Sequence, residues 1–178
     1  FTPKASAATY SGSCGENLEW SFDKETGTLT ISGEGEMENY YYSEWNNKIE
    51  WDTPWKSYRL LIKKFVIEDG VTSIGEDAFA GCKNNLTSVT IPASVKEIGL
   101  KAFAEQENLE TVIINGSTII DVQAFYLCPK LKTVVIGEGT EQIYAGAFSM
   151  CFSLESVTIA DTVTKILGEA FANCTKLK

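Results

Sequence analysis

The sequence of 178 residues contains no histidine. This absence excludes Ser-His-Asp and Cys-His catalysis, histidine metal sites and the usual proton shuttle near neutral pH. An enzyme built from this chain would have to use carboxylates, a lysine or a thiol, and no spacing of these residues points to a catalytic constellation. We therefore predict a protein that is not an enzyme, with no catalytic residues and no cofactor.

Basic residues are scarce, since 15 Lys and Arg stand against 24 Asp and Glu, and the formal net charge is -9. Nucleic acids and anionic membranes are bound by clustered Lys and Arg, so neither is an expected partner. Long apolar runs are missing too, because no stretch approaches the roughly 18 residues needed to cross a bilayer. We expect no membrane insertion in this chain.

An internal repeat of about 23 residues dominates the rest of the chain. Its units contain Ala-Phe, a cysteine three residues after the phenylalanine, and then Leu-x-x-Val-x-Ile. The phenylalanines are Phe79, Phe103, Phe125, Phe148 and Phe171, and the cysteines are Cys82, Cys128, Cys151 and Cys174. One unit carries Gln106 in place of cysteine. This regularity predicts a solenoid in which each unit forms one coil.

Each coil is expected to contain two extended pieces. Val and Ile, two residues apart, share one face of a strand. A turn follows, and then a short extended piece that ends at Ile74 and its counterparts. Ala-Phe is expected to begin a single-turn helical segment. The last unit stops inside a coil, so we expect that the native protein continues or that this coil frays.

The first 58 residues have a different pattern. Leu18, Trp20 and Phe22 alternate with polar residues, and Leu29 and Ile31 do so again after a short loop. This pattern predicts a β-hairpin that covers the open edge of the first coil. We therefore assign residues 1–58 to a β-rich cap with an aromatic-rich insert, and residues 59–178 to a solenoid of about five coils, the last one incomplete.

The sequence resembles the BspA-like leucine-rich-repeat surface proteins of bacteria, whose units read roughly I-x-x-x-A-F-x-x-C-x-x-L-x-x-V-x-I-P. The phrases CGENLEWSF, GTLTISGEG and VIEDGVTSIGEDAF resemble the N-terminal ends of such arrays. With the spacing, the resemblance implies an α/β, β-rich leucine-rich-repeat solenoid with an N-terminal β-hairpin cap. It also implies an extracellular protein, secreted or displayed on the cell wall, that adheres to a protein or glycan on a host or neighbouring cell.

The cysteines are the first candidate site. Metal and redox sites commonly place two cysteines close together, as in Cys-x-x-Cys, and the repeat does not. Cysteine also behaves as a small, buried apolar residue. We expect a structural ladder of buried free thiols and no metal, the alternative being a disulfide between neighbouring coils. Cys14 lies outside the repeat and is expected to be a buried thiol of the cap.

Two surfaces are candidates for ligand binding. The first is the aromatic insert with Tyr40, Tyr41, Tyr42 and Trp45, because flat rings stack on sugars and anchor interfaces; it supports the alternative of a carbohydrate-binding module. Trp55 and Tyr58 are expected to pack the cap onto the first coil. The second surface is formed by the outward residues of the repeat strands, with Thr90, Thr111, Thr133 and Thr158.

Two apolar residues peculiar to one coil, Met150 and Phe152, are further contact candidates. Glu34, Glu36 and Glu38 are expected to form a solvated strand face.

Overall fold

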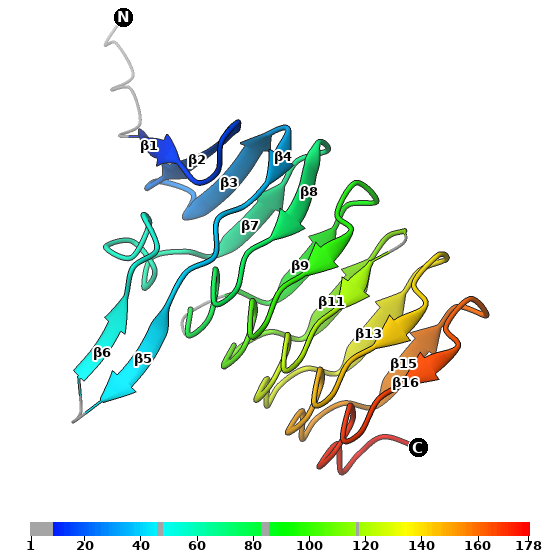
Figure 1. The fold of residues 1–178 in the computed structure, drawn as a ribbon. Coiled ribbons are helices and arrows are strands. Elements are labelled where there is room, and N and C mark those ends of the chain that lie inside the picture. Colours follow the sequence, from blue (N-terminus) through cyan, green and yellow to red (C-terminus); the bar gives the residue numbers. More distant parts are fainter. Residues whose placement is uncertain (1–8, 46–47, 83–85, 117) are drawn as a thin grey trace, which may run out of the picture.

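The structure, a computed structural model, describes residues 9–45, 48–82, 86–116 and 118–178, with residues 42–45 and 48–51 described by their backbone alone. These residues form sixteen strands and no helix. Four sheets result, and the strands of three of them enclose one continuous core. Figure 1 shows an elongated stack of coils that begins at the cap and ends at the C-terminus.

The cap sheet has the strand order β1-β2-β3-β7. Its members are β1 (Thr9–Ser13), β2 (Leu18–Asp23), β3 (Thr28–Gly33) and β7 (Lys64–Ile67). The predicted hairpin is formed by β2 and β3, which are antiparallel. Strand β3 then pairs in parallel with β7, the long strand of the coil that contains Phe79. The hairpin thereby occupies an edge that would otherwise leave a row of unpaired amides, as expected for a cap.

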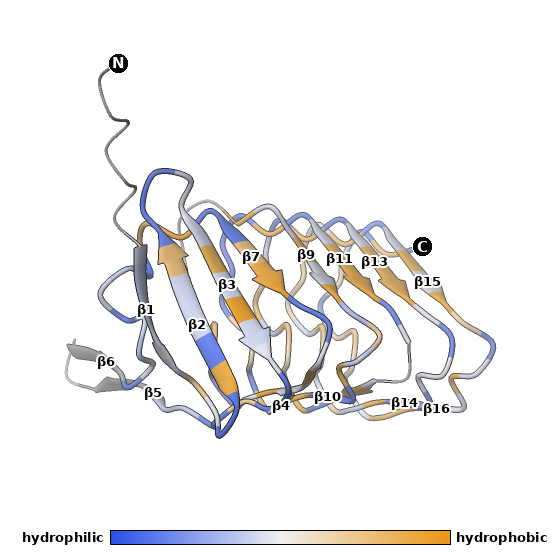
Figure 2. Ribbon diagram, turned by 90° about the horizontal axis from the view of Figure 1, so that it is seen from above, coloured by the Kyte–Doolittle hydropathy of each residue, from blue (hydrophilic) through white to orange (hydrophobic). Residues whose placement is uncertain are grey.

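The long-strand sheet consists of β9 (Ser88–Ile91), β11 (Thr111–Ile114), β13 (Thr133–Ile136) and β15 (Ser156–Ile159), all parallel. The Val and Ile of each Val-x-Ile are buried in the first three strands, as the spacing predicts. In β15 the same two residues are only partly buried, because no further coil covers them in this structure. Figure 2 shows these strands along one side of the stack and the short strands along the other.

The short-strand sheet has the order β4-β8-β10-β12-β14-β16. Its strands are β4 (Gly35–Glu36), β8 (Val71–Ile74), β10 (Glu97–Ile98), β12 (Ile119–Ile120), β14 (Gln142–Ile143) and β16 (Lys165–Ile166). The second extended piece of each coil, predicted to end at an isoleucine, is thus confirmed. The remaining sheet is an antiparallel hairpin of β5 (Tyr42–Trp45) and β6 (Lys48–Trp51), which projects from the cap end in Figure 1.

The solenoid of about 23-residue coils is confirmed, but the helical segment predicted after Ala-Phe is wrong. These residues form consecutive turns at 76–81, 100–105, 122–127, 145–150 and 168–173. Ala102 N donates back to Gly99 O at 3.1 Å, but alternate amides donate across to the next coil, as Phe103 N does to Ala124 O at 2.8 Å. Left-handed backbone at Gln123 (φ 56°) and Leu127 (φ 55°) turns these amides outward along the stack. A helix would instead direct them back along its own axis.

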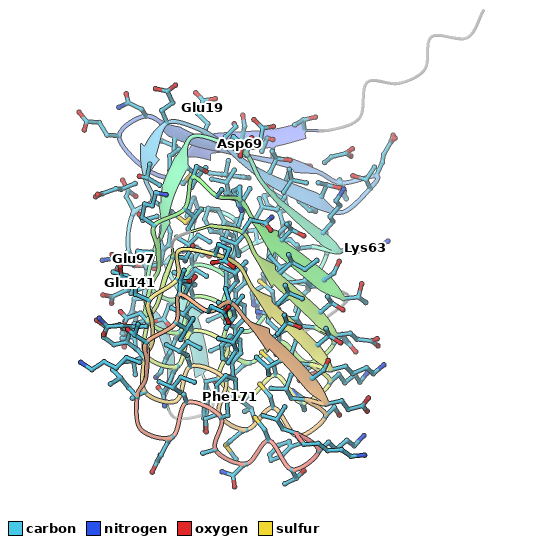
Figure 3. All side chains as sticks on the ribbon, turned by 90° about the vertical axis from the view of Figure 1, so that its right-hand side faces the viewer. Glu19, Lys63, Asp69, Glu97, Glu141 and Phe171 are labelled. Atoms are coloured by element: carbon cyan, nitrogen blue, oxygen red, sulfur yellow. The ribbon has the colours of Figure 1, made fainter. Side chains whose placement is uncertain are left out.

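The phenylalanines form a column through the core, and it begins with a tryptophan. Trp55 is buried and stacks on Phe79, so it takes the phenylalanine position of the first coil. Successive ring centroids in the order Trp55, Phe79, Phe103, Phe125, Phe148, Phe171 are 5.4, 5.0, 5.1, 5.2 and 5.3 Å apart. Figure 3 shows Phe171 at the C-terminal end of this column, between the two sheets. Offset aromatic stacking adds to the burial energy of each ring.

Candidate functional site

The outward residues of the long-strand sheet form two parallel rows. Strand register places Ser88, Thr111, Thr133 and Ser156 in the first row, and Thr90, Ile113, Val135 and Thr158 in the second. We call these eight residues the long-strand face. The four candidate threonines are therefore split: Thr111 and Thr133 are neighbours in one row, whereas Thr90 and Thr158 stand at the two ends of the other. The structure brings them onto one face but not into one cluster.

The long-strand face carries no charge, although charged residues run beside it. Glu110 and Lys132, each one residue before the first row, form an ion pair at 2.9 Å between Oε2 and Nζ. The hydrogen bond from Lys132 lowers the pKa of the Glu110 carboxyl. Lys176 and Glu155 approach to 3.8 Å in the next two coils. An uncharged strip bordered by solvated charges has the composition of an interface core with its polar rim.

A groove lies at the N-terminal end of the long-strand face. No backbone ladder joins β7 to β9, although the coils that contain these strands are paired on the other side through β8 and β10. Phe65 of β7 stands where other coils have valine, and its ring packs 4.3 Å from that of Phe79. We infer that this larger side chain keeps the two strands apart. The groove holds about 450 Å³ and is lined by residues that include Lys64, Val66, Asp69, Ser88, Thr90 and Asn115.

Of these groove residues, Ser88 and Thr90 belong to the outward strand positions that the sequence predicts as a candidate surface. Asp69 and Asn115 lie in the turns after β7 and β11, and no repeat position connects them. The phenylalanine at a valine position was the available signal, because an oversized inward residue disturbs the spacing of neighbouring strands.

The cysteines are single thiols in the structure, and four of the five are fully buried. Cys128 Sγ donates to the carbonyl oxygen of Phe103 at 3.4 Å, Cys151 Sγ to that of Phe125 at 3.4 Å, and Cys174 Sγ to that of Phe148 at 3.2 Å. Gln106, which replaces cysteine, donates its amide to the carbonyl oxygen of Phe79 at 2.5 Å. At these four positions the side chain therefore supplies a hydrogen-bond donor to the preceding coil, whether it is a thiol or an amide.

The surroundings of the thiols disfavour ionisation. Burial raises the pKa of Cys82 to about 12. Burial, together with Glu38 and Glu19, raises the pKa of Cys14 to about 12. The hydrogen bond with Cys128 raises the pKa of Cys151. Since the thiolate is the nucleophile and the metal ligand, these cysteines are poorly suited to either role.

The aromatic insert is divided by the structure. Tyr40 is buried and packs edge-on against Trp55 at 5.3 Å between centroids, and burial raises the pKa of its hydroxyl. Tyr41, in contrast, is 56% exposed. Tyr42 and Trp45 belong to β5, and their side chains lie outside the described part of the chain. Trp55 contacts both Trp20 of the cap and Phe79 of the solenoid, as predicted, whereas Tyr58 stacks on Phe22 of the cap at 5.0 Å.

Several other candidates can also be placed. Phe152 is 38% exposed, and Met150 is half-buried with a left-handed backbone, φ 63°. Glu34, Glu36 and Glu38 are all exposed. In the described residues, no group of three or more Cys, Asp and Glu side chains is arranged to hold a metal ion. Nor does any helix of that part of the chain have the length and apolar character needed to cross a membrane.

Comparison with known proteins identifies the class to which this architecture belongs. The BspA type leucine rich repeat region family matches residues 57–178 in six copies. Because this match covers more than half of the sequence, the chain belongs to that family, as the repeat pattern predicted. A search of curated proteins gives no match.

Two solved structures are similar to the chain. A leucine-rich repeat protein from Eubacterium ventriosum has a TM-score of 0.51 and 20% identity, and the alignment covers 96% of this chain and 71% of that one. A leucine rich cell surface protein from Faecalibacterium prausnitzii has a TM-score of 0.51 and 26% identity, covering 97% of this chain and 54% of that one. The chain thus spans about half the length of the second protein.

Proposed function

We propose that this chain is a binding and adhesion module of an extracellular bacterial protein, secreted or displayed on the cell surface. It acts without catalysis, and the long-strand face contacts a protein on a host or neighbouring cell. Membership of the repeat family and the likeness to a protein described as a cell surface protein support this proposal.

The observation that carries the proposal is the absence of charge from the long-strand face. Its rows hold only hydroxyl and aliphatic side chains, in a chain where 22% of residues are charged. Charged residues are depleted in the cores of protein interfaces because their desolvation is costly. The groove between β7 and β9 adds a concave feature at one end, where a partner side chain can anchor.

The β5–β6 hairpin carries a second candidate function, binding of a carbohydrate through the aromatic insert. Two observations favour it: the hairpin pairs with no other sheet among the described residues, and Tyr41 at its base is exposed. One observation opposes it, because the Tyr40 side chain is buried in the core and is not accessible to a ligand. The insert therefore contributes Tyr41, Tyr42 and Trp45 at most to such a site.

The experiment compares three variants on an array of secreted and cell-surface host proteins and on a glycan array. Thr133→Lys places a positive charge in the middle of the long-strand face. Thr164→Lys is the control, because it places the same charge on an exposed threonine next to β16 of the short-strand sheet. In the third variant a Gly-Ser linker replaces residues 42–51. Deleting residues 1–58 is unsuitable because it removes Trp55 and the cap sheet from the core.

We expect Thr133→Lys to weaken binding to a host protein at least tenfold, with Thr164→Lys and the linker variant unchanged. Equal binding by Thr133→Lys and the parent chain would exclude the long-strand face. A glycan hit that the linker variant abolishes would favour the carbohydrate alternative instead.

A further inference from the structure

A second groove lies on the opposite side of the molecule, over the short-strand sheet. It holds about 310 Å³ and is lined by Lys96, Thr118, Ile119, Glu141, Gln142 and Tyr144, together with Gly139. This volume is at the lower end of the range for small-ligand pockets, about 300–1,000 Å³. The groove therefore suits a ligand of one or two rings. Figure 3 shows Glu97 and Glu141 on this side of the stack, and the coil of Ile119 lies between their coils.

Ile119 gives this groove an apolar floor at a place where the repeat otherwise presents polar side chains. Outward residues at the corresponding positions of neighbouring short strands are Ser73, Glu97, Gln142 and Lys165. Ile119 is nonetheless 45% exposed. Tyr144, half-buried, adds an aromatic ring to the lining of the same groove. The aliphatic side chain of Ile119 and the aromatic ring of Tyr144 can together contact the apolar C–H face of a ligand ring.

The polar groups of the groove include both signs of charge. Lys96 and Glu141 both line it, and Lys96 Nζ donates to the carbonyl oxygen of Ala93 at 3.1 Å. Within the described residues, no lysine or arginine forms an ion pair with Glu141. The Thr118 hydroxyl is already bonded to the carbonyl oxygen of Val95 at 2.9 Å. Glu141, Gln142 and the remaining protons of Lys96 thus provide acceptors and donors for a ligand.

The backbone under the groove offers no edge to a peptide. Strands β10, β12 and β14 are each paired on both sides, so an extended peptide cannot add a strand there. A net charge gives a ligand no advantage there, because a charge of either sign is attracted by one of Lys96 and Glu141 and repelled by the other. A neutral ligand with many hydroxyl groups can instead donate to Glu141, accept from Lys96 and lay its apolar face on Ile119 and Tyr144.

We propose that this groove binds a neutral saccharide unit, with Tyr144 and Ile119 under the sugar ring and Glu141, Gln142 and Lys96 on its hydroxyl groups. The site is separate from the long-strand face and from the aromatic insert. It gives the module a second contact, with the glycan component of a cell surface.

The test uses the full chain on an array of neutral oligosaccharides, followed by calorimetric titration of the best ligand. Tyr144→Ala removes the ring, and Glu141→Gln removes the charge while keeping the shape. Tyr126→Ala is the matched control, since Tyr126 is equally half-buried but lies on the turns of the preceding coil. Thermal melting verifies that each variant is folded, and Glu141→Gln, an exposed substitution, provides the test if Tyr144→Ala unfolds.

We expect at least one neutral glycan to bind, with affinity reduced tenfold or more by Tyr144→Ala and by Glu141→Gln, and unchanged by Tyr126→Ala. The linker variant and Thr133→Lys retain this binding, which separates the site from the two surfaces considered above. Absence of any neutral glycan ligand would overturn the proposal. So would a ligand whose affinity both groove substitutions leave intact, or binding confined to cationic peptides.

Discussion

At the scale of single residues, the cysteines and Gln106 are explained by the carbonyl groups beneath them. The phenylalanine carbonyl of each preceding coil would be a buried acceptor without a partner unless the following coil provided a donor. Leaving such a group unpaired costs about 1–3 kcal/mol. Cysteine provides a weak donor at the size of a small apolar side chain, and the Gln106 amide provides a stronger one at a larger volume.

This hydrogen-bonding role of the cysteines and Gln106 could not be predicted from the sequence alone. The regular spacing placed the cysteines in the core, but it did not show the direction of each thiol. The replacement by Gln106 looked like a departure from the repeat, since an amide and a thiol share little as apolar side chains. Their common property, donation to the preceding coil, becomes visible only when the coils are stacked.

Alkaline pH is expected to destabilise the protein through its thiols. The pKa of Cys82 rises from 9.0 to about 12 on burial, so the folded chain keeps a proton that the unfolded chain releases. Its contribution to stability is therefore complete below pH 9 and is lost as the pH rises from about 9 towards 12. Urea unfolding at pH 7 and pH 10.5 measures this effect, and a Cys82→Val variant serves as the control. An identical pH dependence in the two proteins would contradict the assignment.

At the scale of elements, the strands were predictable and the turns were not. Val-x-Ile spacing identified both the strand and its buried face. Side chains alternate between the two faces of a strand, so the apolar residues at every second position mark the face that is buried. The five turns, however, have left-handed residues as different as Asp77, Lys101, Gln123, Gly146 and Glu169 at one equivalent position. No residue type marks that conformation. The tight return of the chain was therefore interpreted as a helical turn.

The first coil could not be recognised from the repeat pattern, because a different residue type occupies its key position. Trp55 takes a position that phenylalanine holds in every later coil, so a search for Ala-Phe does not find it. Its ring nevertheless meets Phe79 at 20° between planes, and its indole nitrogen donates to the carbonyl oxygen of Ala78 at 3.1 Å. The assignment of residues 1–58 to a separate cap stays a prediction.

The aromatic column predicts a graded response to truncation. Phe125 is fully buried with a stacked ring on each side, whereas Phe171 is half-buried and has a neighbouring ring on one side among the described residues. We expect Phe125→Ala to lower the free energy of unfolding by about 3–5 kcal/mol. Phe171→Ala should cost roughly half as much, because it loses fewer contacts and leaves no closed cavity. Chemical denaturation of the two variants measures the difference; equal losses would show that the column is not the main support of the coils.

At the scale of the whole molecule, stability is shared between neighbours. Each coil contacts only the coils before and after it, so the stack behaves as a one-dimensional array with interface terms. The cap end is closed by the β2–β3 hairpin, while Ile166 at the other end is 51% exposed. Sequence repeats predict such an array well, but they do not predict how the two ends differ.

This asymmetry sets the order in which the chain of 178 residues should open. Strand β15 buries its inward residues only in part, whereas the same positions of β11 and β13 are fully buried. Amides of residues 156–177 should therefore exchange with solvent through local opening, and those of residues 111–136 only through larger unfolding. Hydrogen exchange followed by mass spectrometry measures both segments in one experiment. We expect residues 156–177 to exchange at least tenfold faster, and to slow when one further repeat unit is appended in frame. Uniform protection, or no slowing in the extended chain, would mean that the coils unfold as a single unit rather than from the open end.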